Sequence, residues 1–206
     1  SANWNKVTPN IRIASMSLSG TTTENDSLGC ASSALHQAIC NSTAKGITYV
    51  AAAGNNGADL ATSAPATYSE VLTVTAMSDS DGTPGGNGGA PGCRTSESDD
   101  VPATFSNFAT SAGDQAHTIA APGVCTYSTW LSGGYNTISG TSMAAPHASG
   151  IAALCIANGK CGNNSPATVK ATLRNDAAAQ PSGYGFTGSP ASGTKYYGYL
   201  AYAGAY

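Results

Sequence analysis

The chain has 206 residues, with 8 basic and 11 acidic side chains and a formal net charge of −3. Charged residues make up only 9% of the sequence, against about 25% in an average soluble domain, but the hydrophobic fraction of 41% allows a real core. The sequence has no run of Lys or Arg, no signal-peptide pattern and no apolar stretch near the roughly 18 residues of a membrane span. These features argue against nucleic-acid and membrane binding.

The first half of the sequence predicts a strand–helix–strand unit. Residues 11–18 alternate in polarity like a strand, and residues 32–45 place apolar side chains at helical spacing before a Gly stop. Residues 47–53 form a short continuous apolar run, which is typical of a strand buried on both faces. Such a unit with short links predicts a parallel sheet and an α/β fold. The turn at residues 54–57 follows the second strand, at the sheet edge where sites collect.

The second half predicts further elements of both types. Short apolar runs, turn residues and cap residues define them. They are a buried strand at 71–76, short strands at 103–108 and 117–121, a turn at Pro122-Gly123, a helix from Met143 to Ala157 with a stop at Gly159, a helix with Ser165 as N-cap and Pro166 at its first position, and an aromatic tail at 196–206 that docks on the body.

Residues 78–100 differ in composition from the rest of the chain. Gly, Pro and Ser dominate, and five of the eleven acidic residues lie here: Asp79, Asp81, Glu97, Asp99 and Asp100. We expect an exposed loop, inserted into the domain. Asp79-Ser80-Asp81-Gly82 resembles the start of a calcium loop but lacks the rest of that pattern, which favours a solvated loop. A structural calcium ion is compatible with the sequence, but no metal ligand can be assigned.

The six cysteines form no CxxC pair, and the three histidines are too scattered for a zinc site. An even number of cysteines in a chain rich in Ala, Gly and Ser favours disulfides and an exported protein, although buried free thiols are the alternative. Fifteen pairings are possible. Spacing suggests Cys30–Cys40 and Cys155–Cys161, which leaves Cys93–Cys125. Because residues 30 and 40 would be about 15 Å apart within one helix, Cys30 must precede the helix.

One stretch is the strongest candidate for chemistry: Gly140-Thr141-Ser142-Met143-Ala144-Ala145-Pro146-His147. It places Ser142 at the start of a predicted helix, with Pro146 in the first turn, where a missing N–H costs nothing. Free amides and the helix dipole favour a developing negative charge at this end. A serine that attacks a carbonyl creates such a charge. The alternative is that Ser142 only caps the helix.

Together with residues 16–20 and 51–55, this stretch resembles the subtilisin-like serine proteases, or subtilases. The three motifs occur in the family's order, and the similarity runs from about residue 11 to the tail. The resemblance implies a three-layer α/β fold with a parallel sheet that lacks its N-terminal strands here. Residues 1–206 would be the C-terminal portion of a single subtilase catalytic domain. It also implies a cis peptide bond at Ala64-Pro65.

The resemblance assigns a role to several residues. It implies that Ser142 is the nucleophile and that the Asn55 side chain and the Ser142 N–H form the oxyanion hole. Without the other motifs, Asn55 would be a turn residue. It implies that Ser17, Leu18 and Ser19 pair with the substrate backbone, whereas the alternative is a plain strand end. It implies a specificity pocket walled by residues 17–19 and by Ala52, Ala53 and Gly54, with Ser63 to Ala66 near its floor. Because none of these residues is charged, we expect apolar or aromatic substrate side chains to be preferred.

The sequence departs from the family at four places. Ser19 stands where the family usually has Gly, Thr118 stands where relatives carry a cation-binding Asp, and the loop at 78–100 is longer than in simple members. The family's catalytic Asp and His motifs are both missing. We expect His36, His117 and His147 to be structural. Because serine is a poor nucleophile without a base, this chain alone should have little activity.

Two readings therefore lead. In the first, the chain is the serine-bearing fragment of a secreted protease that cleaves proteins or peptides, and a separate N-terminal fragment supplies Asp and His. No cofactor is required for that chemistry. In the second, the chain is an inactive subtilase that serves as a binding or scaffold module. An esterase of the α/β-hydrolase type is a poorer match, because its Gly-x-Ser-x-Gly elbow is absent: Ala144 occupies the last position.

Overall fold

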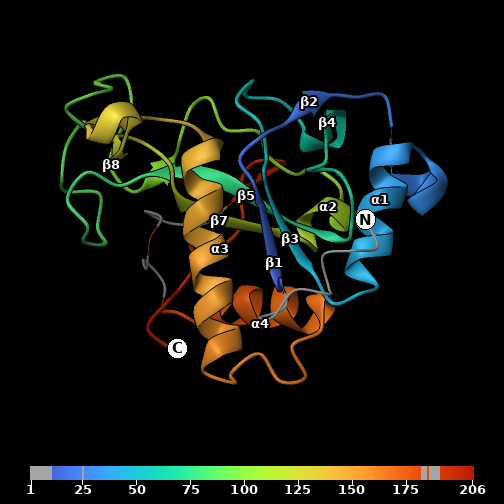
Figure 1. Ribbon diagram of the computed structural model, residues 1–206. Helices are drawn as coiled ribbons and strands as arrows, with labels where there is room; N and C mark the ends of the chain where they lie inside the picture. The colour runs from blue at the N-terminus through green and yellow to red at the C-terminus, as the bar shows by residue number, and fades with distance from the viewer. Residues whose placement is uncertain (1–10, 25, 182–184, 186–190) are drawn as a thin grey trace.

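The computed structural model describes residues 11–24, 26–181, 185 and 191–206. Its centre is a five-stranded sheet in the order β1–β3–β5–β6, with β7 also paired to β5 (Figure 1). Four strands run parallel: β1 (Ile13–Met16), β3 (Thr48–Ala52), β5 (Val71–Ser78) and β7 (Thr118–Pro122). The short strand β6 (Val101–Pro102) is antiparallel to β5. The parallel sheet predicted from the strand–helix–strand pattern is therefore confirmed.

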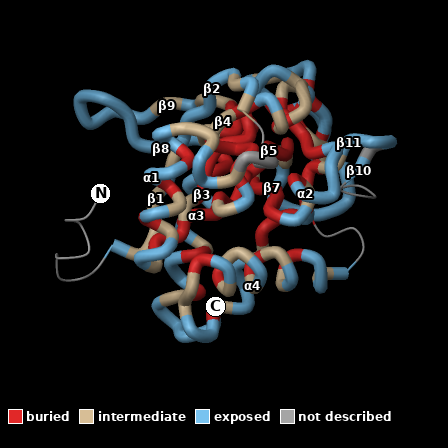
Figure 2. Tube along the Cα trace, turned by 90° about the vertical axis from the view of Figure 1, so that its right-hand side faces the viewer, coloured by how far each residue is buried: buried red, intermediate tan, exposed pale blue. Residues whose placement is uncertain are grey.

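Helices cover both faces of this sheet, so the fold has three layers. The helices α3 (Thr141–Ala157) and α4 (Pro166–Ala178) pack on one face, and α1 (Ala34–Thr43) packs on the other (Figure 1). Alternate residues of β3 show why: Val50 and Ala52 join the cluster beneath α3 and α4, whereas Ala51 joins Ile39 of α1. Figure 2 shows the buried residues concentrated along these strands. Burial on both faces explains the continuous apolar run of β3.

The shorter elements complete the fold. They are the helix α2 (Ala112–Gln115), the strand pairs β2 (Gly20–Thr21) with β4 (Ser63–Ala64), β8 (Thr126–Thr129) with β9 (Tyr135–Ile138), and β10 (Ala191–Ser192) with β11 (Lys195–Tyr196), and the 3₁₀ turns η2 (Asp26–Ala31), η3 (Leu60–Thr62) and η4 (Leu131–Gly133). None of the helices in the described part of the chain has both the length and the apolar character needed to cross a bilayer.

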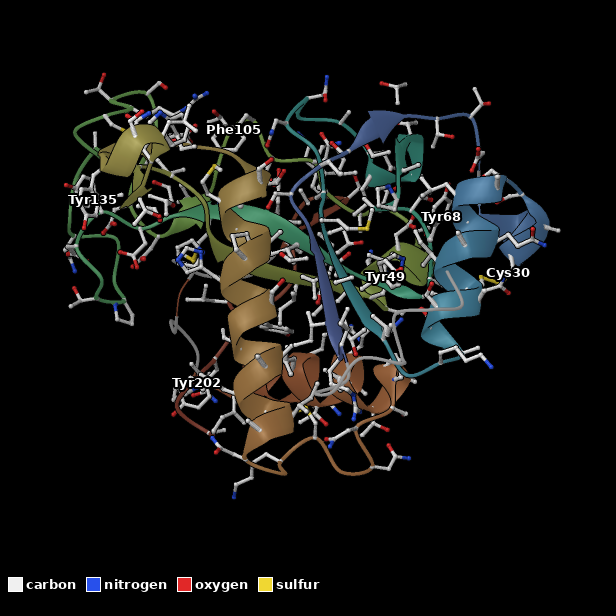
Figure 3. All side chains as sticks on the ribbon, in the orientation of Figure 1. Cys30, Tyr49, Tyr68, Phe105, Tyr135 and Tyr202 are labelled. Carbon is white, nitrogen blue, oxygen red and sulfur yellow. A yellow bond between two sulfur atoms is a disulfide. The ribbon has the colours of Figure 1, made fainter. Side chains whose placement is uncertain are left out.

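The cap of α4 and the disulfides follow the sequence predictions. Ser165 caps α4 through its side chain and Pro166 is at its start, and the structure adds Ser33 as the cap of α1. The bonds Cys30–Cys40, Cys93–Cys125 and Cys155–Cys161 are all present, and Cys30 precedes α1. Figure 3 shows Cys30 beside α1 and Tyr68 pointing toward the same helix. The Ala64–Pro65 bond is cis, as the resemblance implied.

The tail docks on the body as predicted. Tyr196 bonds to Ala109 through both backbone groups, and the backbone of residues 199–201 bonds to Ala120. The Tyr206 hydroxyl donates to Asp176 at 2.6 Å. Burial, and then this contact with Asp176, raises the pKa of the Tyr206 hydroxyl. The tail thus pairs with the middle of β7 and reaches α4.

The strand predicted at residues 103–108 is absent, and the loop predicted at residues 78–100 is present but only partly exposed. Residues 103–108 do not form a strand, because they follow the turn at residues 54–58 instead: the Asn107 N–H donates to Gly54 O, and the Gly57 N–H donates to Phe105 O. Residues 78–100 contain no helix or strand beyond the last residue of β5, but the loop is not exposed throughout. Glu97, Asp99 and Asp100 are buried, because backbone N–H groups of the loop surround the two aspartates and Thr104 donates to Glu97.

Candidate active site

Ser142 lies where α3 begins, at the edge where β1 and β3 end (Figure 1). It is half-buried and is joined to the segment that follows β1 by two hydrogen bonds. The Ser142 hydroxyl donates to the Ser17 carbonyl at 3.1 Å, and the Ser17 hydroxyl donates to the Ser142 carbonyl at 2.7 Å. The predicted nucleophile and the predicted substrate-binding segment are therefore neighbours.

The position of Pro146 in α3 differs from the prediction. The helix begins at Thr141, two residues earlier than predicted, so Pro146 lies inside the helix rather than in its first turn. A proline there has no N–H to donate to the carbonyl four residues earlier. That carbonyl belongs to Ser142, and it accepts the hydroxyl of Ser17 instead. Pro146 thus frees a backbone acceptor beside the candidate nucleophile.

Asn55 follows β3 and reaches the first turn of α3. Its side-chain oxygen accepts hydrogen bonds from the N–H and the hydroxyl of Thr141, at 2.8 and 2.9 Å. These contacts direct its Nδ2 toward the helix start: an ideal Cβ placed on Gly140 would lie 3.5 Å from Asn55 Nδ2 and 3.6 Å from the Ser142 nitrogen. Two donors therefore approach one point beside Ser142. Within the described residues, neither donor has an acceptor.

The loop that carries Asn55 is held from two sides. Gly54 adopts φ +107°, and its N–H donates to the Thr141 hydroxyl at 3.1 Å. On the other side, Asn107 is buried and bonds to four groups of this region through its side chain. A Cβ on Gly54 would lie only 2.4 Å from Asn107 Nδ2, so only glycine fits there.

The other predicted substrate-binding residues surround this loop. Ser17, Leu18 and Ser19 are exposed, and Leu18 is 53% accessible. By contrast, Ala52, Ala53, Gly54 and Ser63 are buried, and the Ser63 hydroxyl accepts from Asn107 Nδ2 at 2.9 Å. Pairing of β2 with β4 brings residues 20–21 beside residues 63–64. The three predicted pocket segments are thus adjacent, and no charged side chain belongs to them.

None of the three histidines bonds to Ser142. His36 is fully buried and stacks on Tyr68. Its two ring nitrogens form hydrogen bonds of 2.8 Å, Nδ1 with the Ser32 hydroxyl and Nε2 with the Glu70 carboxylate. His117 is buried, and its Nε2 lies 3.7 Å from Asp114 Oδ1. His147 bonds through Nδ1 to the Met143 carbonyl in its own helix. These contacts agree with the expected structural roles, and among the described residues no histidine bonds to Ser142.

The acidic loop brings Asp79, Asp99 and Asp100 together, with one carboxylate oxygen from each within 4.8 Å of the others. The hydrogen bond from the Ser80 N–H is the largest influence on the pKa of Asp99 and holds it below its usual value, whereas burial raises the pKa of Asp100. Both Asp99 oxygens already accept loop amides, as does one oxygen of each neighbour. This arrangement fits a loop tied by carboxylates better than a cation cage of six to eight free oxygens. Thr118, at the family's Asp position, is buried and donates to the Asp114 carbonyl. We assign no metal.

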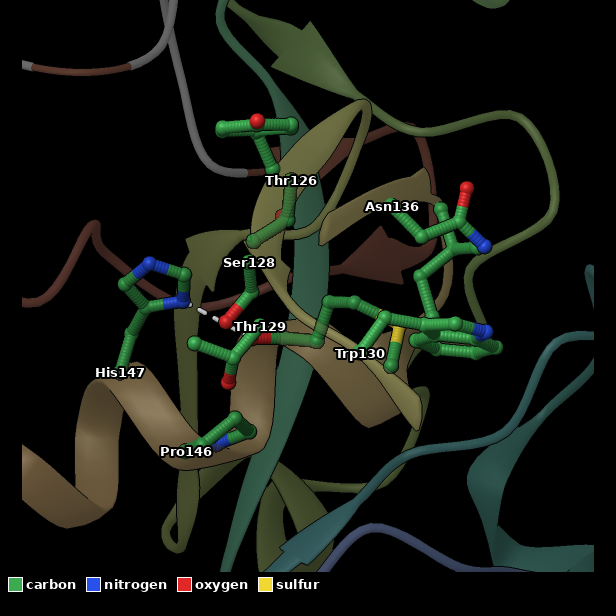
Figure 4. A pocket seen from close by; sticks show the side chains of 10 residues that line it. Thr126, Ser128, Thr129, Trp130, Asn136, Pro146 and His147 are labelled. Atoms are coloured by element: carbon green, nitrogen blue, oxygen red, sulfur yellow. Dashed lines mark hydrogen bonds between the residues drawn. The ribbon is translucent and has the colours of Figure 1, made fainter. Parts of the chain in front are cut away.

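A pocket of about 400 Å³ lies on the other side of Met143, between α3 and the β8–β9 hairpin (Figure 4). The hairpin was not predicted from the sequence, because its polar strands lack an apolar face. The residues that line the pocket are Thr126, Tyr127, Ser128, Thr129, Trp130, Asn136, Ile138, Met143, Pro146 and His147. Tyr127 and Tyr135 stack on each other while both are more than 60% exposed. An open, partly aromatic surface therefore adjoins the candidate nucleophile.

Comparison with known proteins decides the family. The model of the subtilase family, Peptidase_S8, matches residues 2–196. The chain belongs to the subtilase family. This subtilase is 33% identical over 192 residues to a cuticle-degrading serine protease of Arthrobotrys oligospora, and the match covers 91% of this chain and 39% of that protein. It is 37% identical over 145 residues to the alkaline serine protease ver112 of Corniculantispora psalliotae, a match that covers 70% of this chain and 29% of that protein.

Solved structures confirm the subtilisin-like fold. A cold-adapted subtilisin-like serine proteinase superposes with a TM-score of 0.64 at 27% identity, over 93% of this chain and 54% of that one. The self-cleaved protease domain of PatA gives a TM-score of 0.57 at 28% identity, over 80% of this chain and 53% of that one. This subtilase thus spans about half the length of these structures and about a third of the length of the curated relatives.

Sequence reasoning missed two residues that shape this site. Thr141 was quoted only as part of the serine motif, and its bonds to Gly54 and Asn55 could not be read from spacing. Asn107 lies in a segment predicted to be a strand. The one signal in the sequence is an Asn between Ser106 and Phe108, where a strand interior disfavours it.

Proposed function

We propose that the chain is the serine-bearing portion of an endopeptidase that hydrolyses peptide bonds through an acyl-enzyme on Ser142. One observation carries the proposal: Asn55 Nδ2 and the Ser142 nitrogen lie 3.5 and 3.6 Å from one point beside Gly140, and neither has an acceptor among the described residues. A tetrahedral oxyanion formed by attack of Ser142 would receive both donors. Because the Thr141 contacts already orient the Asn55 side chain and α3 fixes the Ser142 N–H, little reorganisation accompanies the reaction.

The reaction then follows the chemistry of serine peptidases. The Ser142 oxygen attacks the peptide carbonyl while a general base removes its proton, and the amine leaves with a proton from the same group. Water then attacks the acyl-enzyme and releases the acid. In this chain, the Ser142 proton is directed to the Ser17 carbonyl, which is no base. The hydroxyl must turn away from that carbonyl before it can react.

We propose that a separate N-terminal fragment of the same protease supplies the catalytic Asp and His. The topology supports this assignment, because β1 is the edge strand of the sheet among the described residues. A parallel strand added beside β1 would end at the same edge as β1 and β3, and side chains that follow it would lie near Ser142. The apolar residues Ile11 and Leu18 flank β1 and are 40% and 53% exposed. By itself the chain should show little activity.

Two finer assignments complete the proposal. The uncharged surroundings of residues 17–19, 52–54 and 63–66 favour apolar or aromatic side chains before the scissile bond. A peptide library should therefore be cut mainly after such residues, and cleavage mainly after Lys or Arg would refute this assignment. The three disulfides favour an oxidising, extracellular location for the protein. No cofactor takes part in the proposed chemistry.

The proposal is tested by purifying the chain under non-denaturing conditions and identifying what accompanies it. We expect a second polypeptide that contains an Asp-Ser-Gly or Asp-Thr-Gly turn and a His-Gly-Thr sequence, and we expect the assembly to hydrolyse peptides. Removal of that polypeptide should abolish hydrolysis, and the Ser142→Ala variant of the complete assembly should also be inactive. An assembly that contains both motifs yet cleaves no peptide would favour the binding-module reading.

A further inference from the structure

We propose that Asn107 is a positioning residue that sets the location of the oxyanion donor Asn55. The inference rests on the proposed function, since it concerns how the oxyanion hole of that site is held. Asn107 is 1% exposed and lies in the irregular segment after β6. It makes no hydrogen bond to Ser142 or to residues 17–19, so its effect on the oxyanion hole would be exerted through the loop that carries Asn55.

The contacts of Asn107 bracket Asn55 on both sides in the sequence. Its Nδ2 donates to the Ala53 carbonyl at 3.0 Å, two residues before Asn55. Its Oδ1 accepts from the N–H groups of Asn56 and Ala58 at 3.0 and 3.1 Å, after Asn55. Its own backbone N–H donates to the Gly54 carbonyl at 2.9 Å. One buried residue thus provides, through its side chain and its backbone N–H, the hydrogen bonds that a strand or helix would otherwise provide for this loop.

The amide of Asn107 also links the loop to the predicted pocket. Its Nδ2 makes a second hydrogen bond to the Ser63 hydroxyl at 2.9 Å, and Ser63 belongs to β4. The four hydrogen bonds require that the side chain of residue 107 carry a donor, which faces Ala53 and Ser63, and an acceptor, which faces the N–H groups of Asn56 and Ala58. Aspartate at position 107 would face the Ala53 carbonyl with an oxygen, so the two acceptors would repel. Only an amide satisfies all four partners.

The need for such a support follows from the shape of the loop. Gly54 has φ +107°, and Asn55 and Asn56 are exposed, so the loop has little burial of its own to hold it. Thr141 fixes the Asn55 side-chain oxygen, but the backbone on both sides of Asn55 is fixed by Asn107. A displacement of about 1 Å in a positioned group can reduce a rate by about 10²-fold. A small shift of Asn55 would therefore lower turnover.

Kinetics of the complete assembly test the inference. We expect Asn107→Ala and Asn107→Asp to lower kcat by about 10- to 100-fold with KM changed less than about 3-fold, because a donor to the transition state is misplaced. In the Asn55→Ala background, Asn107→Ala should lower kcat by less than about 3-fold more, since no donor remains to be positioned. Thr75→Val is the matched control: it removes a buried hydrogen bond, from the Thr75 hydroxyl to the Tyr197 carbonyl, that involves neither Asn107 nor residues 53–58. That variant should keep kcat.

Two kinetic results would overturn the inference: effects of the Asn55 and Asn107 substitutions on kcat that simply multiply, or unchanged kcat in both Asn107 variants. An inactive wild-type assembly would instead refute the proposed function.

A measurement without turnover decides the inference in that case as well. The Thr141 N–H donates to Asn55 Oδ1 and does not contact Asn107, so its hydrogen exchange reports where the Asn55 side chain lies. In the chain by itself, we expect Asn107→Ala to raise the exchange rate at Thr141 to within about 3-fold of that in Asn55→Ala. Thr75→Val should leave it unchanged. Exchange at Thr141 that stays at the wild-type rate in a folded Asn107→Ala chain would overturn the inference.

Discussion

Replacement of Thr141 by Val removes one hydroxyl from the centre of the candidate site. Thr141 is fully buried, and its hydroxyl accepts from the Gly54 N–H at 3.1 Å while it donates to Asn55 Oδ1 at 2.9 Å. Val has a similar shape, so the substitution changes the hydrogen bonds with little change in packing. Asn55 Oδ1 keeps the backbone N–H of residue 141, but the buried Gly54 N–H is left without an acceptor.

The size of the effect follows from that orphaned donor. A buried N–H without a partner costs about 1–3 kcal/mol. For a chain of this length, each kcal/mol shifts Tm by about 2–4 °C, so we expect Tm to fall by about 2–12 °C. In the complete assembly, kcat should fall by about 10-fold, because Asn55 loses one of two contacts. Loss of the Asn55 donor itself should cost about 10²–10³-fold, a magnitude established for subtilisin, a member of this family.

Thermal unfolding and steady-state kinetics measure both effects, with Thr141→Ser as the matched control. Serine keeps the hydroxyl and loses a methyl group, which costs about 1 kcal/mol. We expect the serine variant to retain kcat within about 3-fold, so that the loss in Thr141→Val is assigned to the hydroxyl. If Thr141→Val keeps the wild-type Tm and kcat, or if Thr141→Ser is the more damaged of the two, the hydrogen-bonding argument is wrong.

Two further predictions concern stability away from the site. Burial by itself raises the pKa of Glu70, but hydrogen bonds from His36 and from its own backbone N–H outweigh burial and lower the pKa. The carboxylate therefore stabilises the fold above the unfolded pKa of about 4.3, and that stability is lost as the pH falls through the lower, folded pKa, so Glu70→Gln should lower Tm at pH 7 and have little effect once the pH is below the folded pKa. A Tm difference that does not depend on pH would contradict this assignment. The bond Cys93–Cys125 closes a longer loop than Cys30–Cys40, with separations of 32 and 10 residues. Replacing each pair by serines should therefore cost about 1 kcal/mol more for the longer loop, or about 2–4 °C in Tm; the reverse order would mean that local packing outweighs loop closure.

Much of the fold could be predicted because burial on this sheet follows regular periods. The strand at 47–53 has buried side chains on both faces, and the helix at 32–45 shows its apolar stripe, so both patterns were visible in the sequence. The predicted ends of these elements differed from the observed ones by two residues or fewer. The segment at 103–108 failed because its backbone bonds to the loop at 54–58, a partner distant in sequence.

The candidate site was predictable where a motif carried it and unpredictable where side chains support it. Ser142 and Asn55 were found through motifs, and the structure places them together. The support from Asn107 depends on four hydrogen bonds across about fifty residues of sequence, which no local pattern encodes. Pro146 was placed one turn too early, because nothing local indicates that the helix begins at Thr141. The Ser142 carbonyl that Pro146 leaves without a helix donor could be recognised only from the structure.

The central claim is that Ser142 becomes a nucleophile when a base is supplied to it. A fluorophosphonate probe reports this directly, because it reacts covalently with an activated serine. The complete assembly should carry the adduct on the peptide that contains Ser142, the chain alone should react at least about 10²-fold more slowly, and Asn55→Ala should slow the reaction of the assembly. An assembly that cleaves peptides while Ser142 stays unmodified would contradict the account.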